Sequence, residues 1–165
     1  MQSKKGFIIT GIALAAITAG SFAIWMIPQN SPTNIVMSNP KDQLDSLVDQ
    51  YKAISDSDKE EFGKMISGQI TAENYLGIAD ISSSQIRGMI ISITAPDVPE
   101  NWKSSYESFG EALKAHNTYL RETTVIAQKL KDNPSTDTSQ DKANLEKFIT
   151  QSQEALDASN KARPA

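Results

Sequence analysis

One long apolar stretch near the start of the chain constrains the rest of it more than any other feature. Residues 6–27 read GFIITGIALAAITAGSFAIWMI and contain no charged residue. As a helix with a rise of about 1.5 Å per residue, the stretch would be roughly 33 Å long, enough to cross a bilayer core of about 30 Å. We therefore expect an N-terminal membrane anchor (1–27), a linker (28–38) and one water-facing domain (39–165).

The charges on either side of this stretch predict its orientation. Lys4 and Lys5 precede it, whereas the first positive charge after it is Lys41, which adjoins Asp42. Because positively charged flanks stay on the cytoplasmic side, the N-terminus is expected in the cytoplasm and the domain outside. The sequence thus indicates a single-pass protein of the cell membrane, held by an uncleaved signal anchor.

Two alternatives involve cleavage. The residues Ser21–Ala23 form a small-x-small site, so that a secretory peptidase could release the domain, although the apolar run continues beyond them to Ile27. The residues Lys4–Phe7 resemble the prepilin-peptidase site of type IV pilin-like proteins, with cleavage after Gly6. Gly11 stands where bacterial pilins carry glutamate, and the resemblance covers the first part of the chain alone.

The anchor also carries a stripe of small residues. Its members recur mainly every four residues and share one side of a helix: Gly11, Ala15, Ala16, Ala19, Gly20 and Ala23. Helices associate within a bilayer by close packing, which small residues permit. The stripe predicts docking on another membrane helix, either a second copy or a larger complex. The alternative is a plain anchor that happens to be rich in alanine.

Composition excludes several classes of site and partner. The formal net charge is −4, and the chain contains no cysteine. Disulfides, thiolate metal sites and cysteine nucleophiles are therefore excluded. The acidic residues are spread along the chain without a basic patch, which argues against a nucleic-acid partner.

The remainder reads as an all-α antiparallel bundle. The spacing predicts a helix that Asn39 caps, a second helix that opens at Ser57 and ends at Gly68, and a short helix at 71–79. Residues 82–94 fit a helix better than a buried strand. The longest element, about 99–131, has apolar or small residues at alternating spacings of four and three: Trp102, Tyr106, Phe109, Leu113, His116, Leu120, Thr123, Ala127 and Leu130. This heptad pattern predicts a long helix packed lengthwise on others, followed by a last helix near 139–161.

His116 is the sole histidine and lies within that heptad pattern. It could be a ligand contact or a pH-sensitive position. The alternative is a core histidine bonded to a neighbouring helix. One histidine without cysteine cannot form the usual zinc sets, so we expect no metal site.

Two acidic groups are weak candidates for cation binding. A calcium loop that starts at Asp56 requires glycine at its sixth and glutamate at its twelfth position, where Glu61 and Ser67 stand. Residues 56–61 fit the acidic first turn of a helix instead. Asp42, Asp45 and Asp49 line one side of the first helix, as a solvated face does.

Neither a catalytic motif nor a cofactor loop stands out, and we expect no enzyme. The sequence favours a membrane-tethered, non-catalytic interaction or accessory subunit of a membrane or envelope assembly. Its partners would be the membrane and a protein that contacts the membrane helix or the outer bundle. The alternative is an extracytoplasmic ligand-sensing or solute-binding domain that works through a membrane partner.

Overall fold

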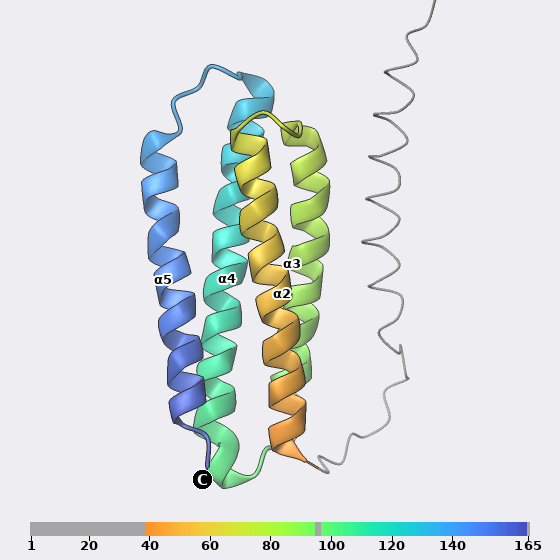
Figure 1. The fold of residues 1–165 in the computed structure, drawn as a ribbon, viewed down its shortest axis with the longest axis vertical. Coiled ribbons are helices and arrows are strands. Elements are labelled where there is room, and N and C mark those ends of the chain that lie inside the picture. Colours follow the sequence, from red (N-terminus) through yellow and green to blue (C-terminus); the bar gives the residue numbers. More distant parts are fainter. Residues whose placement is uncertain (1–38, 95–96, 165) are drawn as a thin grey trace, which may run out of the picture. The chain divides into compact units, whose positions relative to one another are not determined.

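The computed structural model describes residues 39–94 and 97–164. Within these ranges the chain is all-helical, as predicted, and forms a bundle of four helices (Figure 1). In chain order these are α2 (Pro40–Ile66), α3 (Ala72–Thr94), α4 (Glu100–Asp132) and α5 (Ser139–Lys161). Short connections make consecutive helices antiparallel neighbours (Figure 1).

α2 begins as predicted, because the Asn39 side chain accepts hydrogen bonds from the backbone N–H groups of Lys41 and Asp42. The expected break at Ser57 is wrong, since α2 continues to Ile66. Its buried positions keep helical spacing across the supposed break: Leu44, Val48, Tyr51, Ser55, Asp58 and Met65. Burial of this continuous face outweighs the local capping signal at Ser57.

α3 joins two segments that the sequence separates, 71–79 and 82–94. Ser82 and Ser83, at the start of the second expected segment, lie buried inside this single helix. The buried positions again continue at helical spacing: Tyr75, Ala79, Ser82, Ser83, Ile86, Met89 and Ile93. The structure confirms a helix over 82–94, and the strand alternative is wrong.

α4 is a helix of 33 residues, and its predicted heptad pattern is confirmed. From Tyr106 to Ala127 every position of the pattern is buried, while its end positions are half-buried. α5 packs closely on α4 through small side chains. The hydroxyls of Ser105 and Ser159 each donate to the carbonyl oxygen of the other residue, at 2.7 and 2.8 Å.

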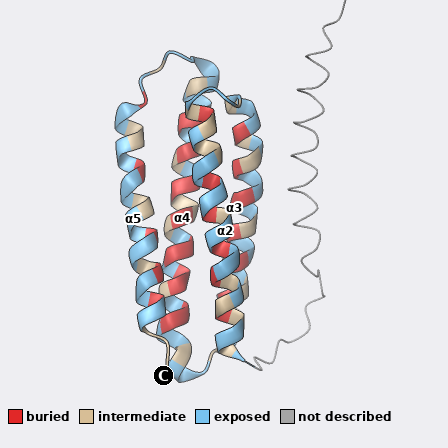
Figure 2. Ribbon diagram, viewed as in Figure 1, coloured by how far each residue is buried: buried red, intermediate tan, exposed pale blue. Residues whose placement is uncertain are grey.

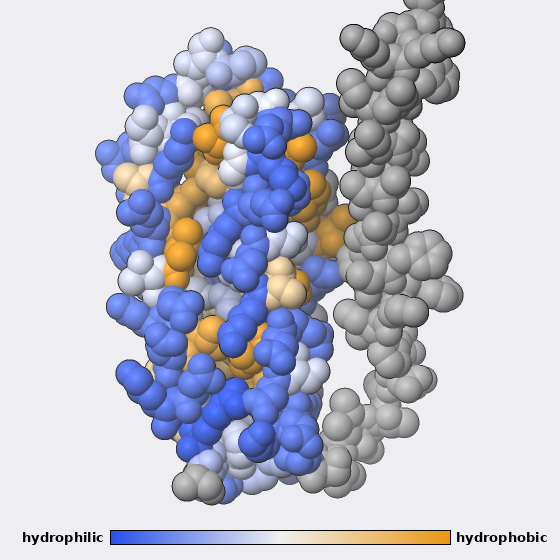
Figure 3. All heavy atoms as spheres, viewed as in Figure 1, coloured by the Kyte–Doolittle hydropathy of each residue, from blue (hydrophilic) through white to orange (hydrophobic). Residues whose placement is uncertain are grey.

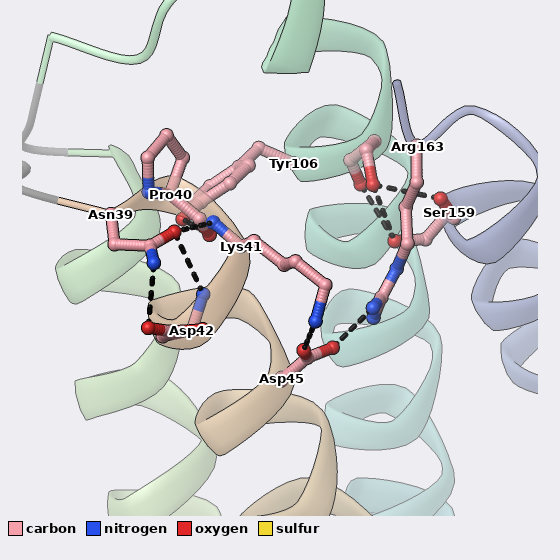
Figure 4. A network of polar contacts seen from close by, with 9 residues as sticks. Asn39, Pro40, Lys41, Asp42, Asp45, Tyr106, Ser159 and Arg163 are labelled. Carbon is pink, nitrogen blue, oxygen red and sulfur yellow. Dashed lines mark hydrogen bonds and ion pairs between the residues drawn. The ribbon is translucent and has the colours of Figure 1, made fainter. Parts of the chain in front are cut away.

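The core is organised around α4, on which buried residues gather along much of its length (Figure 2). α4 lies beside each of the other three helices, whereas no Cα of α2 comes within 8 Å of a Cα of α5. A seam therefore remains between α2 and α5. At one end of this seam, Asp45 contacts both Lys41 and Arg163, which ties the end of α5 to α2 (Figure 4).

Candidate functional site

A buried polar pair lies between α2 and α4. Nε2 of His116 is 2.7 Å from Oδ2 of Asp58, and the two residues are 2% and 1% exposed. The carboxylate oxygen accepts, so the Nε2 atom donates. A buried carboxylate costs much free energy unless it is bonded, and this histidine supplies the bond. His116 thus has the bond to a neighbouring helix that one interpretation of the sequence expected.

Two tyrosines enclose the histidine. The Tyr51 ring meets it edge-on at 5.5 Å between centroids, and the Tyr119 ring stacks on it at 5.4 Å. The Tyr51 hydroxyl is hydrogen-bonded to Ser152 of α5, whose Oγ donates to the Ala112 carbonyl oxygen at 2.9 Å. The pair therefore sits in a network that links α2, α4 and α5.

Burial also controls the ionisation of the neighbouring phenols. The Tyr75 hydroxyl donates to Thr123 at 2.7 Å. Burial raises the pKa of Tyr75, Tyr119 and Tyr51 above the ordinary value, because the phenolate would lose its hydration. These tyrosines remain neutral at physiological pH and serve as packing and hydrogen-bonding groups.

The seam between α2 and α5 opens beside this network into a groove of about 230 Å³. Its buried lining is Tyr51, Ser55, His116 and Leu156, with Ile149 half-buried, and its exposed rim is Lys52, Asp56, Lys59 and Gln153. Figure 3 shows apolar atoms along this seam between hydrophilic borders. The groove is smaller than usual ligand pockets of about 300–1,000 Å³. Tyr51 and Nε2 of His116 are already bonded within the protein, so the polar groups free to face a solute lie mainly on the exposed rim.

Asp58 is the residue of this site that the sequence interpretation missed. The acidic run 56–61 was expected in the first turn of a helix, but it lies in the middle of α2. The sequence held a usable signal, because Asp58 continues the four-and-three spacing that begins at Leu44. A helix read through Ser57 would have placed Asp58 on the core side, opposite His116.

The other acidic candidates lie apart from this pair. Asp45 is engaged by Lys41 at 2.9 Å and by Arg163, and these contacts lower the pKa of its carboxyl group. Asp42 accepts a hydrogen bond from the Asn39 side chain at 2.6 Å (Figure 4). Across residues 39–94 and 97–164, no three potential metal ligands gather into one group.

A different kind of surface lies on the solvent side of α3. Five residues at spacings of four, three, four and three form what we call the outer face of α3: Gly77, Ile81, Ser84, Gly88 and Ile91. All five are exposed, and Ile81 and Ile91 are 52% and 66% exposed. Sequence reasoning missed this face because it treated α3 as two short elements.

The predicted membrane-packing stripe lies outside the described residues. It comprises Gly11, Ala15, Ala16, Ala19, Gly20 and Ala23, and its role stays a prediction. Within the described ranges, none of the helices combines the length and apolar character that crossing a membrane requires.

Comparisons with protein-family models, with curated proteins and with solved structures give no match. The function is therefore inferred from the chemistry and geometry of the bundle itself.

Proposed function

We propose that this chain is a membrane-tethered, non-catalytic interaction module, and that the outer face of α3 is its contact surface. The apolar stretch 6–27 and the charges that precede it support a tether with the bundle outside the cell membrane. The bundle would then present α3 to a helical partner. The single observation that carries this proposal is the combination of exposed isoleucines and unexplained glycines on one helix face.

The glycines are informative because glycine weakens a helix. Each costs roughly 1 kcal/mol relative to alanine in a helix interior. A Cβ atom built on Gly77 or Gly88 would meet no atom within 4 Å, so packing within the described bundle does not require either glycine. At Gly110 of α4, by contrast, such an atom would lie 3.3 Å from Cδ1 of Ile93. A partner that approaches closely from outside would explain Gly77 and Gly88.

The buried polar pair supports a structural role for the bundle interior. Asp58 and His116 are hydrogen-bonded to each other through Oδ2 and Nε2, and the neighbouring hydroxyls of Tyr51 and Tyr75 are bonded to serine and threonine. A general acid or base needs to reach a substrate proton, and His116, although it lines the groove, is 2% exposed and offers little of that access. The polar core therefore favours fold specificity over catalysis.

A charge placed on the outer face tests this function. In the full chain, extracted in mild detergent, Ile81→Lys and Ile91→Lys should abolish the native complex while circular dichroism stays unchanged. Val125→Lys is the matched control, because Val125 is also an exposed apolar residue, 47% exposed, but lies on α4. If both isoleucine variants keep the complex, the outer face of α3 is not the contact surface.

A second candidate function follows from the groove beside His116, which would admit a small solute between α2 and α5. Gln153→Trp would fill the groove from its exposed rim while Asp58 and His116 themselves stay unchanged. Thermal stabilisation of the full chain by a small solute, lost in this variant, would support binding there. Equal stabilisation of both proteins would place the solute elsewhere.

A further inference from the structure

We infer that the partner of the outer face of α3 is a second copy of this chain, bound antiparallel about a two-fold axis. This inference rests on the proposed function and names its partner. The spacing of the outer face, the two charges beside it and the positions of its glycines support a second copy.

The spacing of the outer face is that of a helix seam. Alternation of four and three residues keeps Gly77, Ile81, Ser84, Gly88 and Ile91 in line along α3, as a and d positions do in a coiled coil. The buried positions Ala79, Ile86 and Ile93 lie on the opposite side of the same helix. α3 is therefore built to contact helices on two sides, and the bundle covers one of them.

The charges beside the outer face select a second copy in one orientation. Asp80 and Arg87 are exposed and lie on the same edge of the outer face, two turns apart. Neither forms an ion pair within 4.0 Å in the part of the chain that the structure describes. A two-fold axis perpendicular to α3 brings this edge against itself. Asp80 then faces Arg87 of the second copy, and Arg87 faces its Asp80.

A parallel arrangement lacks this complementarity. It would bring the edge that holds Asp80 and Arg87 against the other edge of the second α3, which consists of Ile78, Gln85 and Ser92. No residue on that edge carries a charge that could pair with Asp80 or Arg87. In the antiparallel arrangement, one surface supplies both halves of each ion pair, as an isologous two-fold interface requires.

The register set by the two ion pairs also explains the glycines. When Asp80 lies opposite Arg87 of the second copy, Gly77 lies opposite its Gly88, and Ile81 lies opposite its Ser84. Glycine facing glycine removes both side chains from a layer, so the two backbones can approach closely. Ile81 then faces a small residue, so a bulky and a small side chain meet in the layer next to the paired glycines.

Cysteine cross-linking tests this register, because the native chain contains no cysteine. Gly77→Cys and Gly88→Cys should both fold, since the space around each glycine is open. A disulfide needs Cα atoms about 4.4–6.8 Å apart. In the full chain in mild detergent, oxidation should link a mixture of the two variants, whereas each variant alone should stay unlinked.

Other cross-linking patterns overturn the inference. Linking of each variant with itself would indicate parallel pairing, and no linking in the mixture would exclude this contact. Gly63→Cys is the matched control, because Gly63 is exposed on α2 with equally open space around it. Linking of this control with Gly77→Cys would reveal random collision and would also refute the specific pairing.

Charge reversal tests the ion pairs independently. Asp80→Arg should raise the dimer dissociation constant about tenfold, because two attractive contacts become repulsive. Adding Arg87→Asp to the same chain should restore the native value. The control Asp49→Arg changes an exposed acidic residue on α2 and should have no effect. Failure of the double variant to recover would contradict the proposed pairing.

The inference and the proposed function can fail separately. If Ile81→Lys and Ile91→Lys dissociate the native complex but the two cysteine variants do not cross-link in the mixture, the outer face binds a different protein. If neither the lysine variants nor the cysteine mixture has any effect, both the contact surface and the second copy are wrong.

Discussion

The inner and the outer face of α3 both repeat at helical spacings, yet their surroundings are opposite. On the inner face, Ile86 is 0% exposed and Ile93 is 5% exposed, against α4. On the outer face, Ile91 is 66% exposed. The same residue type therefore has two roles on one helix. Burial within the bundle explains the isoleucines of the inner face, and contact with a partner would explain those of the outer face.

Gly110 and Gly88 show the same contrast between a position packed within the bundle and an exposed one. Gly110 lies where α4 approaches α3, with Ile93 close to the position a Cβ would take. Gly88 has open space around that position. Internal packing thus explains one glycine and leaves the other unexplained.

The largest effect should come from truncating the inner face. Ile86→Ala should lower the free energy of unfolding by about 2–5 kcal/mol, since it opens a cavity in a packed core. Ile91→Ala, its counterpart on the outer face, should change that free energy by less than about 0.5 kcal/mol in the dissociated chain. Denaturant unfolding of the full chain in detergent measures both. Equal losses would mean that the outer face is buried within one chain.

Alkaline pH should destabilise the core through its buried tyrosines. These are Tyr75 on the inner face of α3, Tyr51 on α2 and Tyr119 on α4. Burial raises the pKa of each in the folded chain, so the unfolded chain releases its phenolic protons first. Stability is therefore fully present below the unfolded pKa of about 10 and falls as pH rises beyond it.

The expected slope is about 1.4 kcal/mol per pH unit for each tyrosine that stays neutral in the fold. Tyr75→Phe should reduce the slope by about one such increment above about pH 11, where the unfolded phenol is ionised, as urea titrations in that range would measure. An unchanged slope in this variant would show that Tyr75 ionises equally in the folded and unfolded chains.

Substitution of the glycines on the outer face should stabilise the fold and weaken association. Gly88→Ala should raise the free energy of unfolding of the dissociated chain by about 0.5–1 kcal/mol, because alanine favours the helix. The same change should weaken the dimer, since the added methyl group occupies the contact. Gly63→Ala on α2 should stabilise the fold equally without affecting association. If Gly88→Ala stabilises the fold and does not weaken association, Gly88 does not serve the close approach of a second copy.

The smallest effect should be that of salt on the outer face. Exposed ion pairs contribute roughly 0.2–1 kcal/mol each, and salt screens them. Raising the ionic strength from about 0.1 to 1 M should therefore raise the dimer dissociation constant several-fold, while unfolding of the inner core changes little. Analytical ultracentrifugation in detergent measures the first quantity. A dimer strengthened by salt would indicate a purely apolar contact.

Periodic burial was readable from the sequence wherever apolar residues mark every turn. The heptad positions from Tyr106 to Ala127, the start of α2 at Asn39 and the bounds of α5 were all predicted correctly. The failures lie where the core contains polar residues. Ser55 and Asp58 continue the buried face of α2, and Ser82 continues that of α3, but each looks locally like a turn or a cap.

The sequence alone specifies the helical class, the long heptad-patterned helix and the acidic, cysteine-free composition. Helical spacing of apolar residues is a local property, so the order of residues carries it. The tertiary structure decided that Asp58 belongs to the core, because His116 lies 58 positions away along the chain and bonds it only after folding. It also decided which face of α3 stays exposed. Both faces repeat alike in sequence, and the packing of α4 against one of them makes them differ.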